Sequence, residues 1–256
     1  MEELNDQELN NESIEPEEEE ELSHTDKLVG VLTAPRETFI KISKHPLKTS
    51  DWFLPLLISS IVALLSFYIM MMNANVRFDF EDKTRIEVEK SISKQLENGQ
   101  LPEDRAEIAR DMGLKWAKLM NPIMKFIGLW FILFFSALIY WLIIKFFFHD
   151  QGQYKTALVG LGMSYYILVF QSILTIILAY ITNKFLNTPN FAEILGVDLH
   201  AFPDFLLSFL DVTMIWYFIV ASIGLSALFK SASTTKYYIL TFGVWIGLSL
   251  ALFSIF

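Results

Sequence analysis

Five long stretches of this chain consist of uncharged, mostly apolar residues, and segments rich in charge separate them. Each stretch is 18 residues or longer, and they cover 52–76, 126–144, 156–183, 212–229 and 237–256. A bilayer core about 30 Å thick is crossed by roughly 20 apolar residues of a helix that rises 1.5 Å per residue. The pattern therefore predicts an all-α, polytopic membrane protein. We expect a bundle of five transmembrane helices, at about 52–74, 122–147, 156–183, 211–229 and 237–256.

Residues 75–120, between the first two predicted spans, are polar but contain apolar positions at helical spacing. Pro102, followed by two acids, marks a break between two helices. The segment predicts an extramembrane helical hairpin. Its apolar stripes could pack on each other, on the membrane surface or on a partner, and we favour packing within the protein. The stripes are Val88, Ile92 and Leu96 in the first helix, and Ile108, Met112, Trp116 and Leu119 in the second.

The N-terminal 26 residues carry 12 Asp and Glu but no Lys or Arg. This composition predicts a disordered acidic tail over 1–26, followed by a membrane domain over 27–256. Basic residues then alternate with apolar ones just before the first span, and Pro35 suits the first turn of a helix. The segment predicts a short amphipathic helix in the membrane interface. Its interfacial basic residues are Lys41, Lys44 and Lys48.

Lys and Arg are distributed unevenly among the segments that flank the spans. Five precede the first span, and lysines also flank the turn at 149–153 and the loop at 231–235. Between spans three and four, by contrast, one lysine stands against four acids. Because cytoplasmic loops are enriched in Lys and Arg, we expect a cytoplasmic N-terminus and an exoplasmic C-terminus.

Sequence patterns typical of enzymes are missing. The chain has no cysteine, and its four histidines lie in tails or loops. It contains no His-Glu-x-x-His motif, no glycine-rich phosphate loop and no second intramembrane acid for an aspartate protease. No basic patch interleaved with aromatic residues indicates nucleic-acid binding. We therefore expect no enzyme, no catalytic or metal-binding residue, no cofactor and no nucleic-acid partner.

Asp211 is the one acid embedded in apolar sequence. An intramembrane carboxylate indicates a functional site by default. We favour the alternative that Asp211 begins span four at the interface, where the helix dipole stabilises a negative charge. Polar residues of span three could line a solute pathway, but interhelical hydrogen bonds explain them equally well.

Small residues recur at four-residue spacing on the last two spans and form ridges that let helices approach closely. The ridges indicate helix packing, either within the chain, which we favour, or between copies. Their members are Ser222 and Ser226 on span four, and Gly243, Gly247 and Ala251 on span five.

Four segments occur in an order found in a known family. They are Ala34–Phe39 with Lys44-His45-Pro46, Tyr154–Leu158 leading to Tyr165-Tyr166, Leu210–Trp216 followed by Gly224, and Lys236 before the last apolar run. With these segments in this order, the chain resembles the Yip domain proteins, which are Ypt/Rab-interacting membrane proteins with five spans. The first segment is similar to the corresponding segment of prokaryotic members. The residues that carry the resemblance are Pro35, Arg36, Phe39, Asp211, Trp216 and Gly224.

The resemblance implies a helical bundle with a cytosolic N-terminus, here in the cytoplasmic membrane of a prokaryote. Eukaryotic members bind prenylated Rab-type GTPases, but Ser50–Pro55 stands in place of their Asp-Leu-Tyr-Gly-Pro motif, which argues against GTPase binding. Some prokaryotic relatives accompany export transporters.

We therefore expect a non-catalytic scaffold or accessory subunit for membrane organisation, trafficking or export. It would contact the lipid bilayer and bind other membrane proteins or itself. The alternative is a small-solute permease or channel.

Overall fold

The structure, a computed structural model, describes residues 21–197 and 201–255, and all regular structure in them is helical. The predicted all-α fold is confirmed. The helices are α1 (His24–Thr33), α2 (Pro35–Ser43), α3 (Ser50–Met72), α4 (Ala74–Glu97), η1 (Glu103–Arg105), α5 (Ala106–Ile143), η2 (Ile144–Phe148), α6 (Tyr154–Ser164), α7 (Tyr166–Thr182), α8 (Phe191–Leu195), α9 (Phe202–Leu207), α10 (Val212–Leu228) and α11 (Thr235–Ile255).

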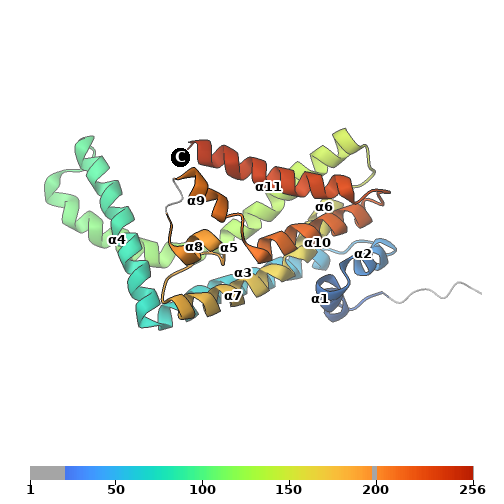
Figure 1. The fold of residues 1–256 in the computed structure, drawn as a ribbon, viewed down its shortest axis with the longest axis horizontal. Helices are drawn as coiled ribbons and strands as arrows, with labels where there is room; N and C mark the ends of the chain where they lie inside the picture. Colours follow the sequence, from blue (N-terminus) through green and yellow to red (C-terminus); the bar gives the residue numbers. More distant parts are fainter. Residues whose placement is uncertain (1–20, 198–200, 256) are drawn as a thin grey trace, which may run out of the picture.

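Helix α6 lies at the centre of the bundle and packs against α3, α5 and α10, while α3 and α7 lie side by side (Figure 1). Two glycines explain how closely α6 is surrounded. A Cβ atom added at Gly162 would lie 2.6 Å from the Cβ of Trp52 on α3, and one added at Gly160 would lie 3.1 Å from the Leu225 side chain on α10. Small residues of this kind let transmembrane helices approach each other closely.

Three helical segments of the described residues are long and apolar enough to cross a bilayer: Ser50–Met72, Glu103–Phe148 and Tyr154–Thr182. Helix α10 is apolar and has 17 residues, which is at the lower limit for a span. Helix α11 has 21 residues. The count of five spans therefore stays a prediction.

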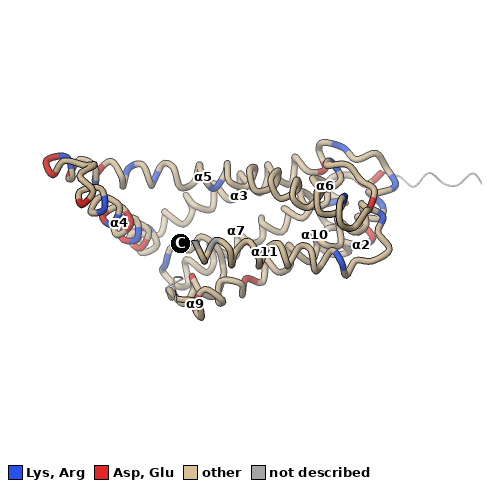
Figure 2. Tube along the Cα trace, turned by 90° about the horizontal axis from the view of Figure 1, so that it is seen from above, with Lys and Arg blue, Asp and Glu red and all other residues tan. Residues whose placement is uncertain are grey.

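Helix α4 and the first part of α5 form a hairpin that extends beyond the bundle, as the sequence predicts (Figures 1 and 2). We call residues 74–120 the hairpin arm. Helix α5 has 38 residues and continues without a break through Pro122, so one helix serves both the arm and the bundle.

Residues 1–20 of the predicted disordered tail lie outside the described residues. The end of that tail is ordered, which corrects its predicted boundary at residue 26. Ser23 and Asp26 form a capping box at the start of α1, in which each side chain accepts a hydrogen bond from the other residue's backbone N–H. The Glu21 carboxylate also lies 2.6 Å from the Lys48 ammonium.

The N-terminal helices, the turn at 149–153 and the loop at 229–234 lie at the same end of the bundle. Lys155 donates a hydrogen bond to the carbonyl oxygen of Leu47, and Lys236 forms an ion pair with Asp150. Figure 2 shows Lys and Arg at this end and also, mixed with Asp and Glu, on the hairpin arm at the opposite end. The three lysine-bearing segments from which the membrane orientation was predicted thus lie close together.

Candidate functional site

The two helices of the hairpin arm are held together by ion pairs and by close backbone packing. The Arg110 guanidinium donates two hydrogen bonds to the Glu89 carboxylate, at 2.6 and 2.8 Å. These bonds lower the pKa of Glu89 below its ordinary value. Lys118 pairs with Glu81 at 2.7 Å nearer the bundle. Val88 packs against Gly113, where an added Cβ atom would lie only 2.8 Å away. The arm is therefore a packed helical hairpin.

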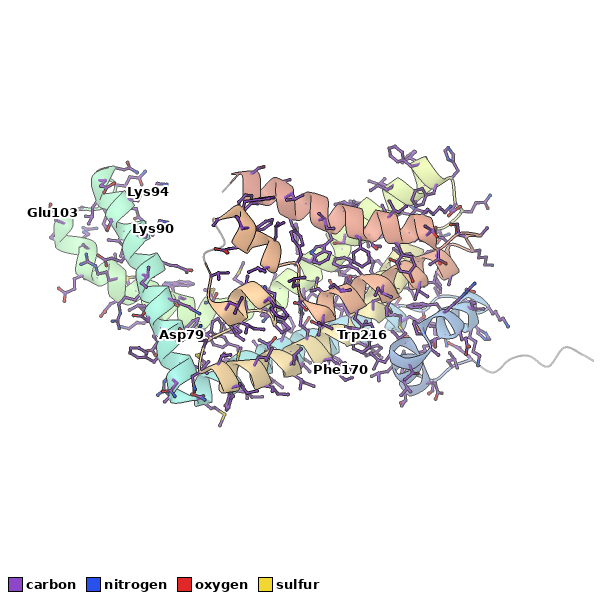
Figure 3. The ribbon with its side chains drawn as sticks, viewed as in Figure 1. Asp79, Lys90, Lys94, Glu103, Phe170 and Trp216 are labelled. Carbon is purple, nitrogen blue, oxygen red and sulfur yellow. The ribbon has the colours of Figure 1, made fainter. Side chains whose placement is uncertain are left out.

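The base of the arm is fixed to the bundle. The Asp79 carboxylate accepts a hydrogen bond from the backbone N–H of Phe185 at 2.8 Å and pairs with Lys83 at 2.8 Å. The Phe80 ring packs edge-on against Phe67 and Phe185, with centroid distances of 5.3 and 4.9 Å. Figure 3 shows Asp79 at this base, Lys90 and Lys94 further out on α4, and Glu103 at the tip.

The apolar stripe on the outer part of α5 is exposed, which contradicts the predicted packing within the protein. The exposed fractions are 62% for Ile108, 53% for Met112, 56% for Trp116 and 54% for Leu119. We call these four residues the arm stripe. Only the stripe on α4 faces its partner helix, since Ile92 is 4% exposed. The arm stripe continues along α5 into the exposed apolar residues Met124, Ile127 and Phe131.

Helix α2, which was predicted to lie in the membrane interface, packs its apolar face on the bundle. Phe39 is fully buried, and its ring occupies the space beside Gly224 of α10, where an added Cβ atom would lie 2.7 Å from it. Burial against protein instead of lipid corrects the predicted interfacial role of this face. Lys41 and Lys44 are exposed on the helix, and Lys48 pairs with Glu21.

The residues of the family resemblance lie on α2 and along α10. Pro35 begins α2, Arg36 is exposed beside it, and Phe39 meets Gly224. Trp216 of α10 lies against Phe170 of α7, with ring centroids 5.9 Å apart (Figure 3).

Asp211 is the N-cap of α10, at the start of the helix as favoured from the sequence. It is 2% exposed and accepts hydrogen bonds from the backbone N–H groups of Thr213 at 2.9 Å and Met214 at 3.0 Å. Its carboxylate also accepts bonds from the Thr213 hydroxyl at 2.6 Å and from Gln171 Nε2 on α7 at 3.1 Å. A buried carboxylate with four donors is a structural anchor between two helices.

The model of the Yip1 domain matches residues 29–256 of this chain. The chain belongs to the Yip1 domain family. The match covers nearly the whole chain, and the family consists of non-enzymatic membrane proteins. This Yip1 domain is therefore an integral membrane protein whose environment is the lipid bilayer. Neither the curated proteins nor the solved structures include a match.

The small-residue ridge on α11 does not pack within this Yip1 domain. Gly243, Gly247 and Ala251 are exposed, and a Cβ atom added at either glycine would meet nothing within 4 Å. The inner face of α11 is formed instead by residues such as Tyr237 and Thr241, both fully buried. The expectation that this ridge packs within the chain is therefore wrong. Packing of the ridge between two copies of the chain stays a prediction.

The serines of the other ridge face α11. Ser222 is buried, with its hydroxyl 2.6 Å from that of Thr241, and the Ser226 hydroxyl lies 3.0 Å from that of Thr234. At the start of α11, Asp150 accepts hydrogen bonds from Lys236 at 2.6 Å and Tyr237 at 2.7 Å. Burial raises the pKa of Asp150, but these bonds outweigh burial and hold it below its ordinary value.

A buried ion pair was missed from the sequence. Lys27 of α1 and Asp51 of α3 lie 2.8 Å apart and are 4% and 1% exposed. Asp51 stands next to an apolar stretch, as Asp211 does, and that position was the available signal. Across residues 21–197 and 201–255, no group of three or more His, Cys, Asp or Glu is placed to hold a metal ion.

Proposed function

We propose that this Yip1 domain is a non-catalytic scaffold or accessory subunit in membrane organisation, trafficking or export. The observation that supports this role is the arm stripe, an exposed apolar face on a hairpin braced by ion pairs. Exposed apolar patches mark interaction sites. Because the stripe continues into the exposed apolar surface of α5 within the bundle, its partner would be another membrane protein that contacts α5 at the bilayer surface.

The residues of the arm stripe can be tested directly. A photo-crosslinking amino acid at Met112 is expected to capture one reproducible membrane protein in native membranes, identified by mass spectrometry. Trp116→Ala should then reduce co-purification of that protein about tenfold or more, because a central aromatic residue of an interface commonly contributes about 2 kcal/mol. Both residues are more than half exposed, so neither change should affect folding.

Ile173→Ala on α7 is the matched control, since Ile173 is 46% exposed but lies outside the arm. Equal recovery of the partner with Trp116→Ala would contradict the arm as the binding surface. A protein that runs as a solitary monomer in mild detergent would contradict the scaffold role itself.

The proposed orientation places the N-terminus in the cytoplasm, the arm and the C-terminus outside, and the protein in a prokaryotic cytoplasmic membrane. The support for the orientation is the positive-inside rule, applied to the N-terminal flank and to the short loops at 149–153 and 229–234. The chain has no cysteine, so single cysteines at exposed Gln100 and Ala232 can report topology. A membrane-impermeant maleimide should label Gln100→Cys in intact cells and Ala232→Cys only after permeabilisation. The reverse pattern would overturn the orientation.

The permease alternative has less support. The span-three hydroxyls on which it rested bond to carbonyl oxygens one turn earlier in their own helices: Ser164 to Gly160, Ser172 to Leu168 and Thr175 to Gln171. Gln171 bonds to Asp211. These bonds give Ser164, Gln171, Ser172 and Thr175 partners within the protein, without a solute.

A further inference from the structure

A groove runs along the inner side of α5, between this helix and α11. Its inner part is a cavity of about 300 Å³ with a buried floor that includes Tyr165 and Tyr217, which are 2% and 8% exposed. The rims, by contrast, are exposed: Ile132 of α5 by 55% and Leu248 of α11 by 49%. A buried floor between exposed rims means that the groove opens sideways from the bundle, toward the lipid.

The groove continues outward along α5. A second cavity, of about 320 Å³, shares Leu129, Ile132, Leu168 and Gln171 with the first. A third, of about 290 Å³, shares Met124, Lys125, Asn187 and Thr188 with the second. We call the three together the α5 groove. From Lys125 to Tyr140 it follows about 22 Å of helix, at 1.5 Å per residue. That length exceeds half of a hydrocarbon core about 30 Å thick.

The middle of the α5 groove presents an apolar surface to an occupant. Its serine hydroxyls donate within the protein: Ser59 donates to the carbonyl oxygen of Tyr165 at 2.7 Å, and Ser172 donates to that of Leu168 at 3.0 Å. Gln171 uses one of its two amide N–H donors in a hydrogen bond to Asp211. What remains is a lining of leucine, isoleucine and glycine, which suits a hydrocarbon chain.

A cation lies at the outer end of this apolar surface. The Lys125 ammonium donates to the carbonyl oxygen of Asn187 at 2.9 Å, and it forms no ion pair with any carboxylate of the described residues. An ammonium has three donors, so two remain. The nearby Glu193 carboxylate is occupied by donors from Asn187 and Thr188, and burial raises its pKa.

We propose that the α5 groove binds a phospholipid with an anionic headgroup, which pairs with Lys125 while one acyl chain lies along α5 toward Tyr140. The groove would contact both parts of such a lipid. The Lys125 ammonium would bind the anionic headgroup, and the apolar lining along α5 would contact the acyl chain. This inference rests on different residues from the four of the arm stripe, although Met124, where the exposed surface of α5 continues from the stripe, also lines the groove.

Gly128 makes the proposal testable, because it lines the groove and an added Cβ atom would meet nothing within 4 Å. Gly128→Phe should therefore fill the groove without displacing backbone. Gly247→Phe is the matched control: Gly247 is also a helical glycine with open space around it, but it lies outside the groove. Ile132→Trp, on the exposed rim, serves if Gly128→Phe does not fold.

The measurement is native mass spectrometry of the full chain in mild detergent, titrated with phosphatidylglycerol or with phosphatidylcholine of the same acyl chains. We expect one phosphatidylglycerol per chain, bound about fivefold more tightly than phosphatidylcholine, which corresponds to about 1 kcal/mol for a basic residue beside an anionic lipid. Gly128→Phe should weaken binding tenfold or more, and Gly247→Phe should not. Lys125→Gln should still bind lipid but lose the preference.

Three results would overturn the proposal. One is wild-type affinity in folded Gly128→Phe and Ile132→Trp. The second is equal affinity of the wild type for both lipids, or a preference that survives Lys125→Gln. The third is loss of a dimer in Gly128→Phe with unchanged lipid content, which would assign the groove to a second copy of the chain.

Discussion

Replacing Lys27 by methionine is expected to destabilise this Yip1 domain by about 3–5 kcal/mol, the usual loss when one partner of a buried ion pair is removed. The ammonium lies 2.8 Å from the Asp51 carboxylate, and both side chains are at most 4% exposed. In the variant, Asp51 would keep the backbone N–H of Lys48, at 2.7 Å, but would be a buried charge without a counterion. The loss should be measured as a lower thermal unfolding temperature in detergent micelles.

Two further variants test whether the loss of stability comes from leaving the Asp51 charge buried without a counterion. The double variant Lys27→Met, Asp51→Leu should recover much of the lost stability, because neither charge remains to be desolvated. Lys48→Gln removes an exposed lysine that pairs with Glu21 and should change stability little. If Lys27→Met unfolds at the wild-type temperature, the buried pair does not hold α1 on α3.

The second large effect is expected at Phe39. Phe39→Ala should cost about 3–5 kcal/mol, as large-to-small changes in a packed core do. The ring is fully buried against Gly224, so its removal leaves a cavity between α2 and α10. Ile40→Ala is the control, since the neighbouring side chain is 42% exposed. Thermal unfolding again gives the measurement.

A compensating change tests whether the two residues meet as described. Gly224→Leu alone should destabilise, because even its Cβ atom would lie 2.7 Å from the ring of Phe39. Combined with Phe39→Ala, the same leucine should restore part of the stability by filling the vacated space. Simple addition of the two losses would show that the residues do not share one cavity.

The sequence predicted the helical architecture because the length of an uncharged run is itself a physical requirement of a bilayer. The runs at 52–76 and 156–183 correspond to α3 and to α6 with α7, and the break at Pro102 separates α4 from α5. Asp211 was interpreted correctly as a helix start for a similar reason, since a carboxylate before an apolar helix is a local signal.

The sequence could not predict whether protein or lipid covers each apolar helix face. Lipid and protein interior are equally apolar, so periodicity shows that a face avoids water but not which of the two covers it. Thus Phe39 packs on protein where lipid was expected, and Gly243 faces outward where protein was expected. The Lys27–Asp51 pair was missed because it depends on α1 folding back onto the start of α3, a contact between residues 24 positions apart.

The continuity of α5 through Pro122 has a mechanical consequence. The helix that carries the arm stripe also forms one wall of the α5 groove, so a single helix joins the two surfaces. A tilt of the arm that α5 transmits past Pro122 would shift that wall relative to α11, which packs chiefly on α10. Proline removes one main-chain hydrogen bond from the helix at this point, so a bend of α5 at Pro122 would separate the motion of the arm from that of the groove wall.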